Sequence, residues 1–162
     1  KLGSAREREI AVNSYAPHAR MTVVHEYGHF LDHQILGSGK PGLAGLATHS
    51  NNPEVKSLMK ALVKTPEVQR LRAKMRDPNT PEHHKQYLAY LLMPAELFAR
   101  SYSQYITRKS RDPRMQHELN GVRRADRQMF GYESQWSDAN FSAVHHEFDN
   151  LFERRNLRMR NA

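Results

Sequence analysis

Two histidines and a glutamate lie within five residues of one another, at His25, Glu26 and His29. Histidines four positions apart on a helix project from the same face, about 40° apart around the helix axis. Both imidazole rings could therefore bind one metal ion, and the spacing suits Zn²⁺. Glu26 is offset from that face, so it would miss the metal but could accept a proton from a water molecule beside it. The pattern H-E-x-x-H predicts a zinc site with a glutamate as general base.

A chance match is the first alternative, because the chain holds 10 histidines. Shuffling such a composition would produce H-E-x-x-H in roughly a few per cent of sequences. In that case the segment would be a helix with two surface histidines. The apolar neighbours Val24 and Phe30 argue against this alternative, because an unpaired polar ring would be costly to bury among them. Gly28 costs about 1 kcal/mol relative to alanine inside a helix, so it indicates close approach by another backbone or by a substrate.

A catalytic zinc site needs a third protein ligand and keeps its fourth position open. The chain has no cysteine, so this ligand must be His, Asp or Glu. The best candidate is Glu96, which follows Pro94 in the first turn of a predicted helix, where the helix dipole favours an acid. Ala99 and Ser103 share its stripe, and such small residues would let this helix pack closely on the histidine-bearing helix. The alternative is a surface glutamate on an amphipathic helix.

Asp32 and His49 are two further ligand-type residues after this motif. If the helix continues past His29, Asp32 follows one turn later on nearly the same face. Ligands from one straight helix cannot easily surround an ion, so we expect Asp32 to hydrogen-bond a ligand histidine rather than to bind the metal. The sequence does not place His49 relative to the site. Asp32 and His49 are the remaining candidates if Glu96 is not the third ligand.

Two separated motifs carry a resemblance to a known family. The sequence H-E-Y-G-H-x-x-D at residues 25–32 and the sequence E-L-F-A-R at residues 96–100 together resemble gluzincin-type metallopeptidase domains related to anthrax lethal factor. They are closer to the zincin domains of phage and mobile-element polyvalent proteins. The resemblance covers residues 21–36 and 87–106, and residues 136–152 look like the closing helix of such domains.

The resemblance implies a helical zincin-like domain in which the H-E-x-x-H helix packs against a glutamate-bearing helix. In such a domain His25, His29 and Glu96 bind Zn²⁺. Glu26 is the general base, and a protein or peptide is the substrate. The function implied is zinc-dependent hydrolysis of peptide bonds, in a domain of a larger phage or bacterial protein.

The family pattern also implies a tyrosine that donates a hydrogen bond to the oxyanion, and Tyr90 matches it. Tyr87, one turn earlier, and Tyr102 are the alternatives, and each tyrosine could instead be a half-buried packing residue. Arg100 departs from the lethal-factor type, which carries an acid at this position, and this departure favours the phage type. Arg100 could bind substrate, orient Asp32 or face solvent.

The net charge of +8 offers a second function. Such charge permits binding to nucleic acid or to an acidic partner through the basic C-terminal region. The arginines of this region cluster at Arg123, Arg124, Arg127, Arg154, Arg155, Arg158 and Arg160. No helix-turn-helix, RNP-like or zinc-finger pattern accompanies them, so a solvated surface is the simpler interpretation. The alternative function is a nucleic-acid-binding or virion structural module with an inactive zincin core.

The length of 162 residues predicts one domain, which we place at residues 10–156. Residues 1–9 are expected to be a linker or a remnant of cloning, and residues 157–162 a basic tail. No run of 18 apolar residues is present, so we expect no membrane span. We expect a cytoplasmic or phage-particle location rather than secretion, consistent with the absence of cysteine.

The fold is predicted to be mainly α, or α+β if residues 10–12 form a short strand. Proline at the first helical position, preceded by a capping residue and followed by an acid, marks helix starts at Pro53, Pro66 and Pro81. The remaining helices are expected at residues 21–36, from Pro94 onward, at 112–129 and at 137–156. Apolar residues of the last helix, Phe141, Val144, Phe148, Leu151 and Phe152, form a stripe expected to face the core.

Overall fold

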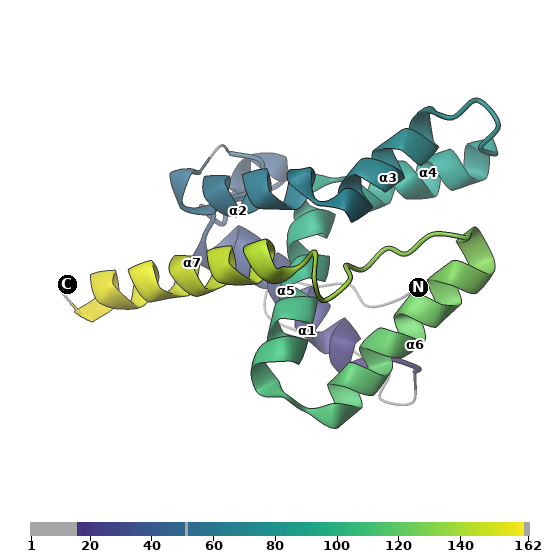
Figure 1. Cartoon of the computed structure of the whole chain (residues 1–162). Coiled ribbons are helices and arrows are strands. Elements are labelled where there is room, and N and C mark those ends of the chain that lie inside the picture. Colours follow the sequence, from purple (N-terminus) through teal and green to yellow (C-terminus); the bar gives the residue numbers. More distant parts are fainter. Residues whose placement is uncertain (1–15, 51, 161–162) are drawn as a thin grey trace.

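The computed structural model describes residues 16–50 and 52–160, and this part of the chain is helical without a strand (Figure 1). The mainly-α prediction is confirmed, whereas the strand considered at residues 10–12 lies outside the described residues. The helices are α1 (Ala19–Phe30), α2 (Pro53–Lys64), α3 (Pro66–Arg76), α4 (Glu82–Leu91), α5 (Pro94–Ser110), α6 (Pro113–Phe130) and α7 (Ser142–Arg160). A π-helical turn (Leu31–Ile35) extends α1, and a 3-10 turn (Leu43–Gly45) follows it. Among the described helices, none has the length and apolar character to cross a bilayer.

Capping chemistry explains where three helices begin. The side chains of Asn52, Thr65 and Asp112 each accept a hydrogen bond from a backbone N–H in the first turn of α2, α3 and α6. Each of these helices has proline at its first position, where the missing N–H costs nothing. Proline also begins α5, directly after α4 has ended. The helix starts predicted from these residues are confirmed.

Two predicted helix starts are displaced. Thr80 does not cap α4, because its hydroxyl donates to the Lys74 carbonyl at 2.8 Å, and the helix begins at Glu82. The last helix begins at Ser142 instead of residue 137, since residues 138–141 form a turn. At its other end α7 continues to Arg160, so part of the expected tail extends the helix.

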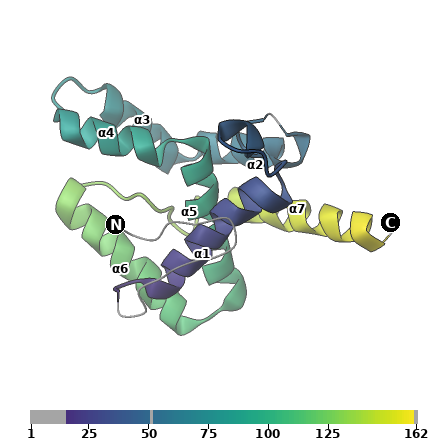
Figure 2. The ribbon, with the colours of Figure 1, turned by 180° about the vertical axis from the view of Figure 1, so that it is seen from behind.

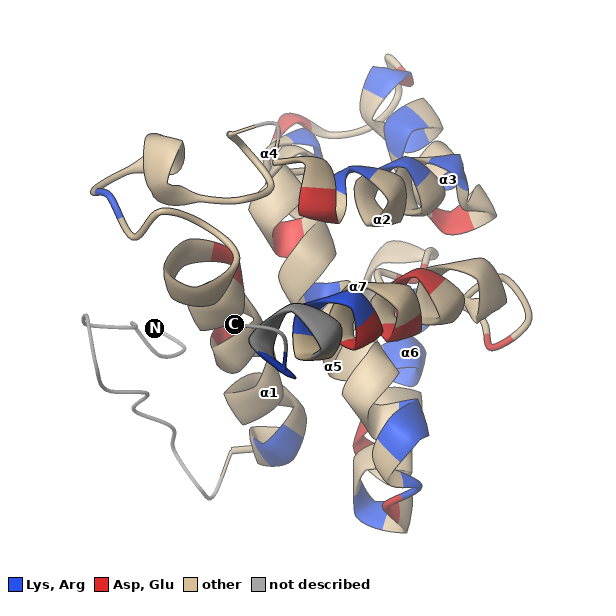
Figure 3. Ribbon diagram, turned by 90° about the vertical axis from the view of Figure 1, so that its left-hand side faces the viewer, with Lys and Arg blue, Asp and Glu red and all other residues tan. Residues whose placement is uncertain are grey.

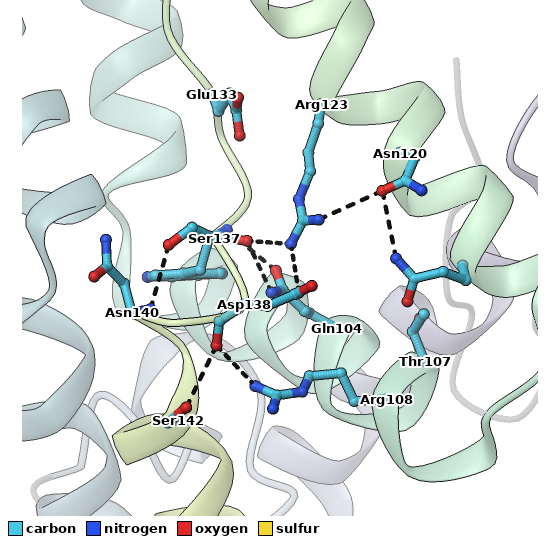
Figure 4. A network of polar contacts seen from close by, with 12 residues as sticks. Gln104, Thr107, Arg108, Asn120, Arg123, Glu133, Ser137, Asp138, Asn140 and Ser142 are labelled. Atoms are coloured by element: carbon cyan, nitrogen blue, oxygen red, sulfur yellow. Dashed lines mark hydrogen bonds and ion pairs between the residues drawn. The ribbon is translucent and has the colours of Figure 1, made fainter.

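The segment between α6 and α7 is irregular in conformation, and side chains hold it against α5 and α6 (Figure 4). Gln104 exchanges two hydrogen bonds with the backbone of Trp136, at 2.9 and 3.1 Å. Arg123 donates to the Trp136 carbonyl and to the Asp138 carboxylate. Arg108 donates to the Asp138 carbonyl at 3.2 Å. These bonds satisfy backbone groups that no helix satisfies, so the segment becomes part of the folded body.

The α1 helix packs directly on α5, as predicted for the helices that carry the two motifs. A Cβ atom built on Gly28 would lie 2.9 Å from the Cα of Ala99, closer than real Cβ contacts allow. Glycine at this position therefore permits the backbones of α1 and α5 to approach. This confirms the expectation that Gly28 meets another backbone.

The buried apolar side chains form two clusters. The larger is the main core between α1, α2, α5 and α7, and it contains the predicted apolar stripe of the last helix. The smaller is built on Leu71, Leu88 and Leu91, within the hairpin of α3 and α4. That hairpin projects to one side of the molecule, the side toward which α6 also extends (Figures 1 and 2). Leu92 packs against both clusters.

Candidate metal centre

The three predicted ligands lie together where α1 crosses α5. His29 Nε2 lies 2.9 Å from Glu96 Oε1, and His25 Nε2 lies 3.5 Å from Glu96 Oε2. The two histidine Nε2 atoms are 3.1 Å apart. One ligand atom from each residue can be chosen so that all lie within 4.8 Å of one another. The pairing of Glu96 with the two histidines was an expectation from residue types and spacing, and the structure brings these side chains together.

The separations suit a small tetrahedral cation. Two ligand atoms at the usual zinc distance of about 2.0–2.1 Å from a tetrahedral ion lie about 3.3 Å apart. The two Nε2 atoms, 3.1 Å apart, and the distances of 2.9 and 3.5 Å from each of them to a different oxygen of Glu96 lie around this value, whereas a set with a single Glu96 oxygen extends to 4.8 Å. Side chains from two different helices supply the ligands, so they can surround an ion in a way that one helix cannot. The donor set of two imidazoles and one carboxylate is one that zinc accepts.

The local sequence explains how each ligand is presented. His25 and His29 lie one turn apart on α1, and their side chains are about three-quarters buried, with exposed fractions of 21% and 26%. Glu96 lies in the first turn of α5, which begins at Pro94, and is 5% exposed. The close approach at Gly28 brings these two helices within ligand range of each other.

The charges of the three side chains are strongly coupled. Burial alone would raise the pKa of Glu96, but hydrogen bonds and charge from His25 and His29 outweigh burial and hold that pKa far below its usual range. Burial alone would lower the pKa of His29, yet its hydrogen bond to Glu96 and the nearby charge of Glu26 raise the pKa above its usual value. Glu96 is thus a buried carboxylate whose charge is stabilised by its pairing with the two histidines.

A cleft of about 530 Å³ opens beside the three ligands. Its walls come from α1, α4, α5, α6 and residues 134–135, and the three ligands and Glu26 line it. His25, His29 and Glu96 would therefore hold a cation at the wall of this cleft. Glu26 is half-buried there, next in sequence to a ligand, as the pattern H-E-x-x-H predicts.

Among the tyrosines considered, Tyr90 lies nearest to the ligand set. It lines the cleft, and burial together with a hydrogen bond to Glu96 raises the pKa of its hydroxyl strongly. Tyr87 also lines the cleft, with its ring stacked on Phe130 at 5.0 Å between centroids. Tyr102, the other alternative, instead packs in the main core with 7% of its surface exposed, and it is not among the described residues that line the cleft.

Asp32 does not have the role expected from the sequence. Its carboxylate accepts from the backbone N–H and the hydroxyl of Thr48, at 2.8 and 2.7 Å, and among the described residues it bonds neither ligand histidine. The cause is the π-helical turn, in which the Leu36 N–H bonds the Leu31 carbonyl five residues back. Asp32 is fully buried and fastens the loop that follows this turn.

Arg100 and His49, whose roles the sequence left open, have different positions. Arg100 is 5% exposed, so it does not face solvent, and it donates to the carbonyls of Leu91 and Ser134 rather than to Asp32. His49 is exposed in the loop before α2 and is not among the described residues that line the cleft.

His18 and Gln135 are among the cleft residues that were not predicted. His18 is the N-terminal flanking residue of α1, in a left-handed conformation with φ of 66°. Gln135 is 5% exposed and comes from the irregular segment before Trp136. No sequence pattern predicts that either residue lines the cleft. His18 lies in the turn before α1 and Gln135 in the irregular segment after α6, and tertiary contacts determine where both side chains lie.

The basic residues of the C-terminal region are partly neutralised. Arg123 pairs with Asp138, Arg127 with Glu133, and Arg155 with Glu54. Lys and Arg also lie on α2 and α3, interspersed with acidic residues (Figure 3). The described surface therefore does not show one basic face confined to the C-terminal region.

Comparisons with protein-family models, with curated proteins and with solved structures give no match. The resemblance to zincins therefore stays a prediction. A function can be proposed from the three clustered ligands and from the cleft beside them.

Proposed function

We propose that this chain is a zinc-dependent metallopeptidase domain. The observation that carries the proposal is the convergence of His25, His29 and Glu96, which offer one ligand atom each within 4.8 Å of one another. Their cleft position supports a catalytic rather than a purely structural site, because a structural zinc is closed by four protein ligands. Among the described residues, these three are the grouping of His, Asp and Glu that could hold a metal ion.

Zinc bound at this site would supply a Lewis acid that polarises a peptide carbonyl and lowers the pKa of water. Glu26 then takes the proton from the water that attacks the carbonyl carbon, and it delivers that proton to the amine nitrogen as the peptide bond breaks. The Tyr90 hydroxyl donates a hydrogen bond to the carbonyl oxygen as negative charge develops on it. Its proton is firmly held, because burial and Glu96 raise the pKa of Tyr90, so it serves as a donor at neutral pH.

The alternative function, binding of nucleic acid or of an acidic partner, has less support. Three arginines of the C-terminal region form ion pairs within the chain, which reduces the charge available to a polyanion. Binding that weakens steeply with salt and is unaffected by Glu26→Gln would favour this alternative.

Elemental analysis of the purified protein tests the proposal. We expect close to one zinc per wild-type chain and a strong loss in both His25→Ala and Glu96→Ala. Glu147→Ala is the control, because Glu147 lines a separate groove between α2 and α7. This variant should keep its zinc. Full zinc in Glu96→Ala would remove Glu96 from the ligand set. Hydrolysis of a mixed peptide library, abolished by a zinc chelator, is expected of the zinc-loaded wild type.

A further inference from the structure

Arg100 is a buried cation that lies one helical turn after Glu96 on α5. Its guanidinium donates to the Leu91 carbonyl at 2.5 Å and to the Ser134 carbonyl. It also lies over the Trp136 ring, 5.3 Å from the centroid. Burial lowers the pKa of Arg100 to about 10, so the side chain keeps its charge at neutral pH. A charged donor bound to neutral carbonyls in a buried place makes strong and directional hydrogen bonds.

The hydrogen bond from Arg100 to the Leu91 carbonyl holds the backbone next to Tyr90. Leu91 is the last residue of α4, and Tyr90 is its neighbour. Tyr90 is 46% exposed, and its nearest ring is that of Tyr87, at 6.4 Å on the same helix. Apart from its hydrogen bond to Glu96, the Tyr90 side chain has no ring contact with another helix among the described residues, so the position of its ring depends on the position of the end of α4.

The α3–α4 hairpin enters the main core through Val68 near the start of α3, whereas at the end of α4 only Leu92 packs against that core in the described chain. The α3–α4 hairpin has its own hydrophobic cluster, and only Leu92 packs against both this cluster and the main core in the described chain. The hairpin projects from the body in both ribbon views (Figures 1 and 2). Arg100 therefore supplies a polar link between the helix that carries Tyr90 and the helix that carries Glu96.

The second acceptor of Arg100 is the carbonyl of Ser134, which is itself held in place by α6. The Ser134 N–H and hydroxyl donate to the buried carboxylate of Asp126 on α6, at 2.7 and 2.5 Å. The carbonyl of the same residue accepts from Arg100. Ser134 is thus held from both sides, and Arg100 is fixed against a segment that is itself attached to α6. One guanidinium joins α4, α5 and the segment before Trp136.

We infer that Arg100 is a positioning residue that holds the end of α4 against α5, so that the Tyr90 hydroxyl lies beside Glu96 in the cleft. Arg100 does not contact the substrate in this role, and it acts through Tyr90. The catalytic consequence rests on the proposed peptidase function, whereas the structural linkage of Arg100 to Tyr90 does not.

Fluorine NMR tests the linkage without any activity. With 3-fluorotyrosine incorporated at position 90, the wild type is expected to give a resonance well separated from that of the unfolded chain. Arg100→Met should move this resonance at least halfway toward the unfolded position while circular dichroism stays helical. Arg123→Met is the matched control, because Arg123 also donates to the segment at Trp136 but does not bond α4. The control should keep the wild-type resonance.

A second variant keeps the test decisive if Arg100→Met does not fold. Arg100→Lys keeps the cation, but a single ammonium lacks the fork geometry that serves two carbonyls. We expect a smaller displacement in the same direction. A wild-type resonance in folded Arg100→Met, or in folded Arg100→Lys when the methionine variant is unfolded, would overturn the inference.

A double-mutant cycle then tests the catalytic consequence on a fluorogenic peptide library. Tyr90→Phe removes one oxyanion donor, so kcat should fall about 10²-fold. Arg100→Met should retain zinc and lower kcat by a similar factor, and the double variant should be no more than about threefold worse than Tyr90→Phe. Losses that multiply to about 10⁴-fold would show that Arg100 acts independently of Tyr90. A zinc-loaded wild type that cleaves no peptide would refute the peptidase proposal and leave the NMR result to decide on Arg100.

Discussion

Gly28 on α1 and Ala99 on α5 lie so close that a Cβ on the glycine would be 2.9 Å from the Cα of the alanine. The contact lies one residue before His29 on one helix and one turn after Glu96 on the other. A backbone contact between the two helices therefore sets the separation of the side chains that form the candidate metal centre. Metal affinity should depend on this contact as well as on the ligands themselves.

Gly28→Ala tests this dependence. The added methyl group meets backbone that cannot rotate away, and such overpacking costs about 1–3 kcal/mol, only partly offset by the better helix propensity of alanine. We expect lower stability in urea denaturation and weaker zinc binding in a competition titration.

Gly121→Ala is the matched control for that substitution. Its new Cβ would meet Cε1 of the His18 ring, at 2.6 Å, and a side chain can move aside. We expect zinc affinity in the control close to that of the wild type. Equal zinc affinities in Gly28→Ala and Gly121→Ala would mean that the α1–α5 contact does not govern the site.

Glu26→Gln should separate zinc binding from catalysis. The amide cannot accept a proton, so the rate of peptide hydrolysis should fall by about 10²–10⁴-fold. Zinc content should stay at the wild-type level, because Glu26 lies outside the ligand set. Glu153→Gln, an exposed change on α7, should alter neither quantity. Wild-type hydrolysis in Glu26→Gln would assign the base to another residue.

Zinc should stabilise the folded chain, because the unfolded chain does not bring Glu96 to the two histidines. At a free zinc concentration of about 100 times Kd, ligand linkage adds about 2.7 kcal/mol to the free energy of unfolding. A chelator should reverse the change, as measured by thermal denaturation followed by circular dichroism. Glu96→Ala should show little response to zinc. A similar rise in Tm for Glu96→Ala would point to binding elsewhere.

Asp32→Ala should affect folding more than metal binding. The substitution leaves the Thr48 N–H without its acceptor in a buried position, which costs about 1–3 kcal/mol. Zinc affinity should change by less than about tenfold, since Asp32 bonds Thr48 and not a ligand histidine. Asp77→Ala, which removes an acceptor from an exposed turn, is the control and should cost less stability. A 10–100-fold loss of zinc affinity in Asp32→Ala would restore the role first expected for it.

Much of the helical framework could be predicted because its determinants are local. Proline at the first position and a capping side chain at Asn52 or Thr65 fix a helix start through bonds within one turn. The histidine pair depends on helical periodicity alone. Glu96 could be proposed as the third ligand because it lies in the first turn of the helix that begins at Pro94, and because this helix has small residues where it faces α1.

What could not be predicted depends on contacts between distant segments. The π-helical turn at Leu31–Ile35 redirects Asp32 toward Thr48, and nothing in the local sequence distinguishes this turn from a continued α-helix. The acceptors of Arg100 are backbone carbonyls, which every residue possesses, so sequence cannot reveal them. The choice between Tyr90 and Tyr102 also required the fold, because only tertiary contacts determine which of the two lines the cleft and which lies in the core.

The two separate hydrophobic clusters have a consequence for how this molecule can change. Residues such as Leu71 and Leu88 can be replaced by side chains of another shape without repacking the interior around α5. Such replacements would tilt one wall of the cleft while leaving the histidine and glutamate side chains where they are. The cleft wall formed by α4 can therefore diverge between descendants of this sequence while the candidate metal centre keeps its three side chains.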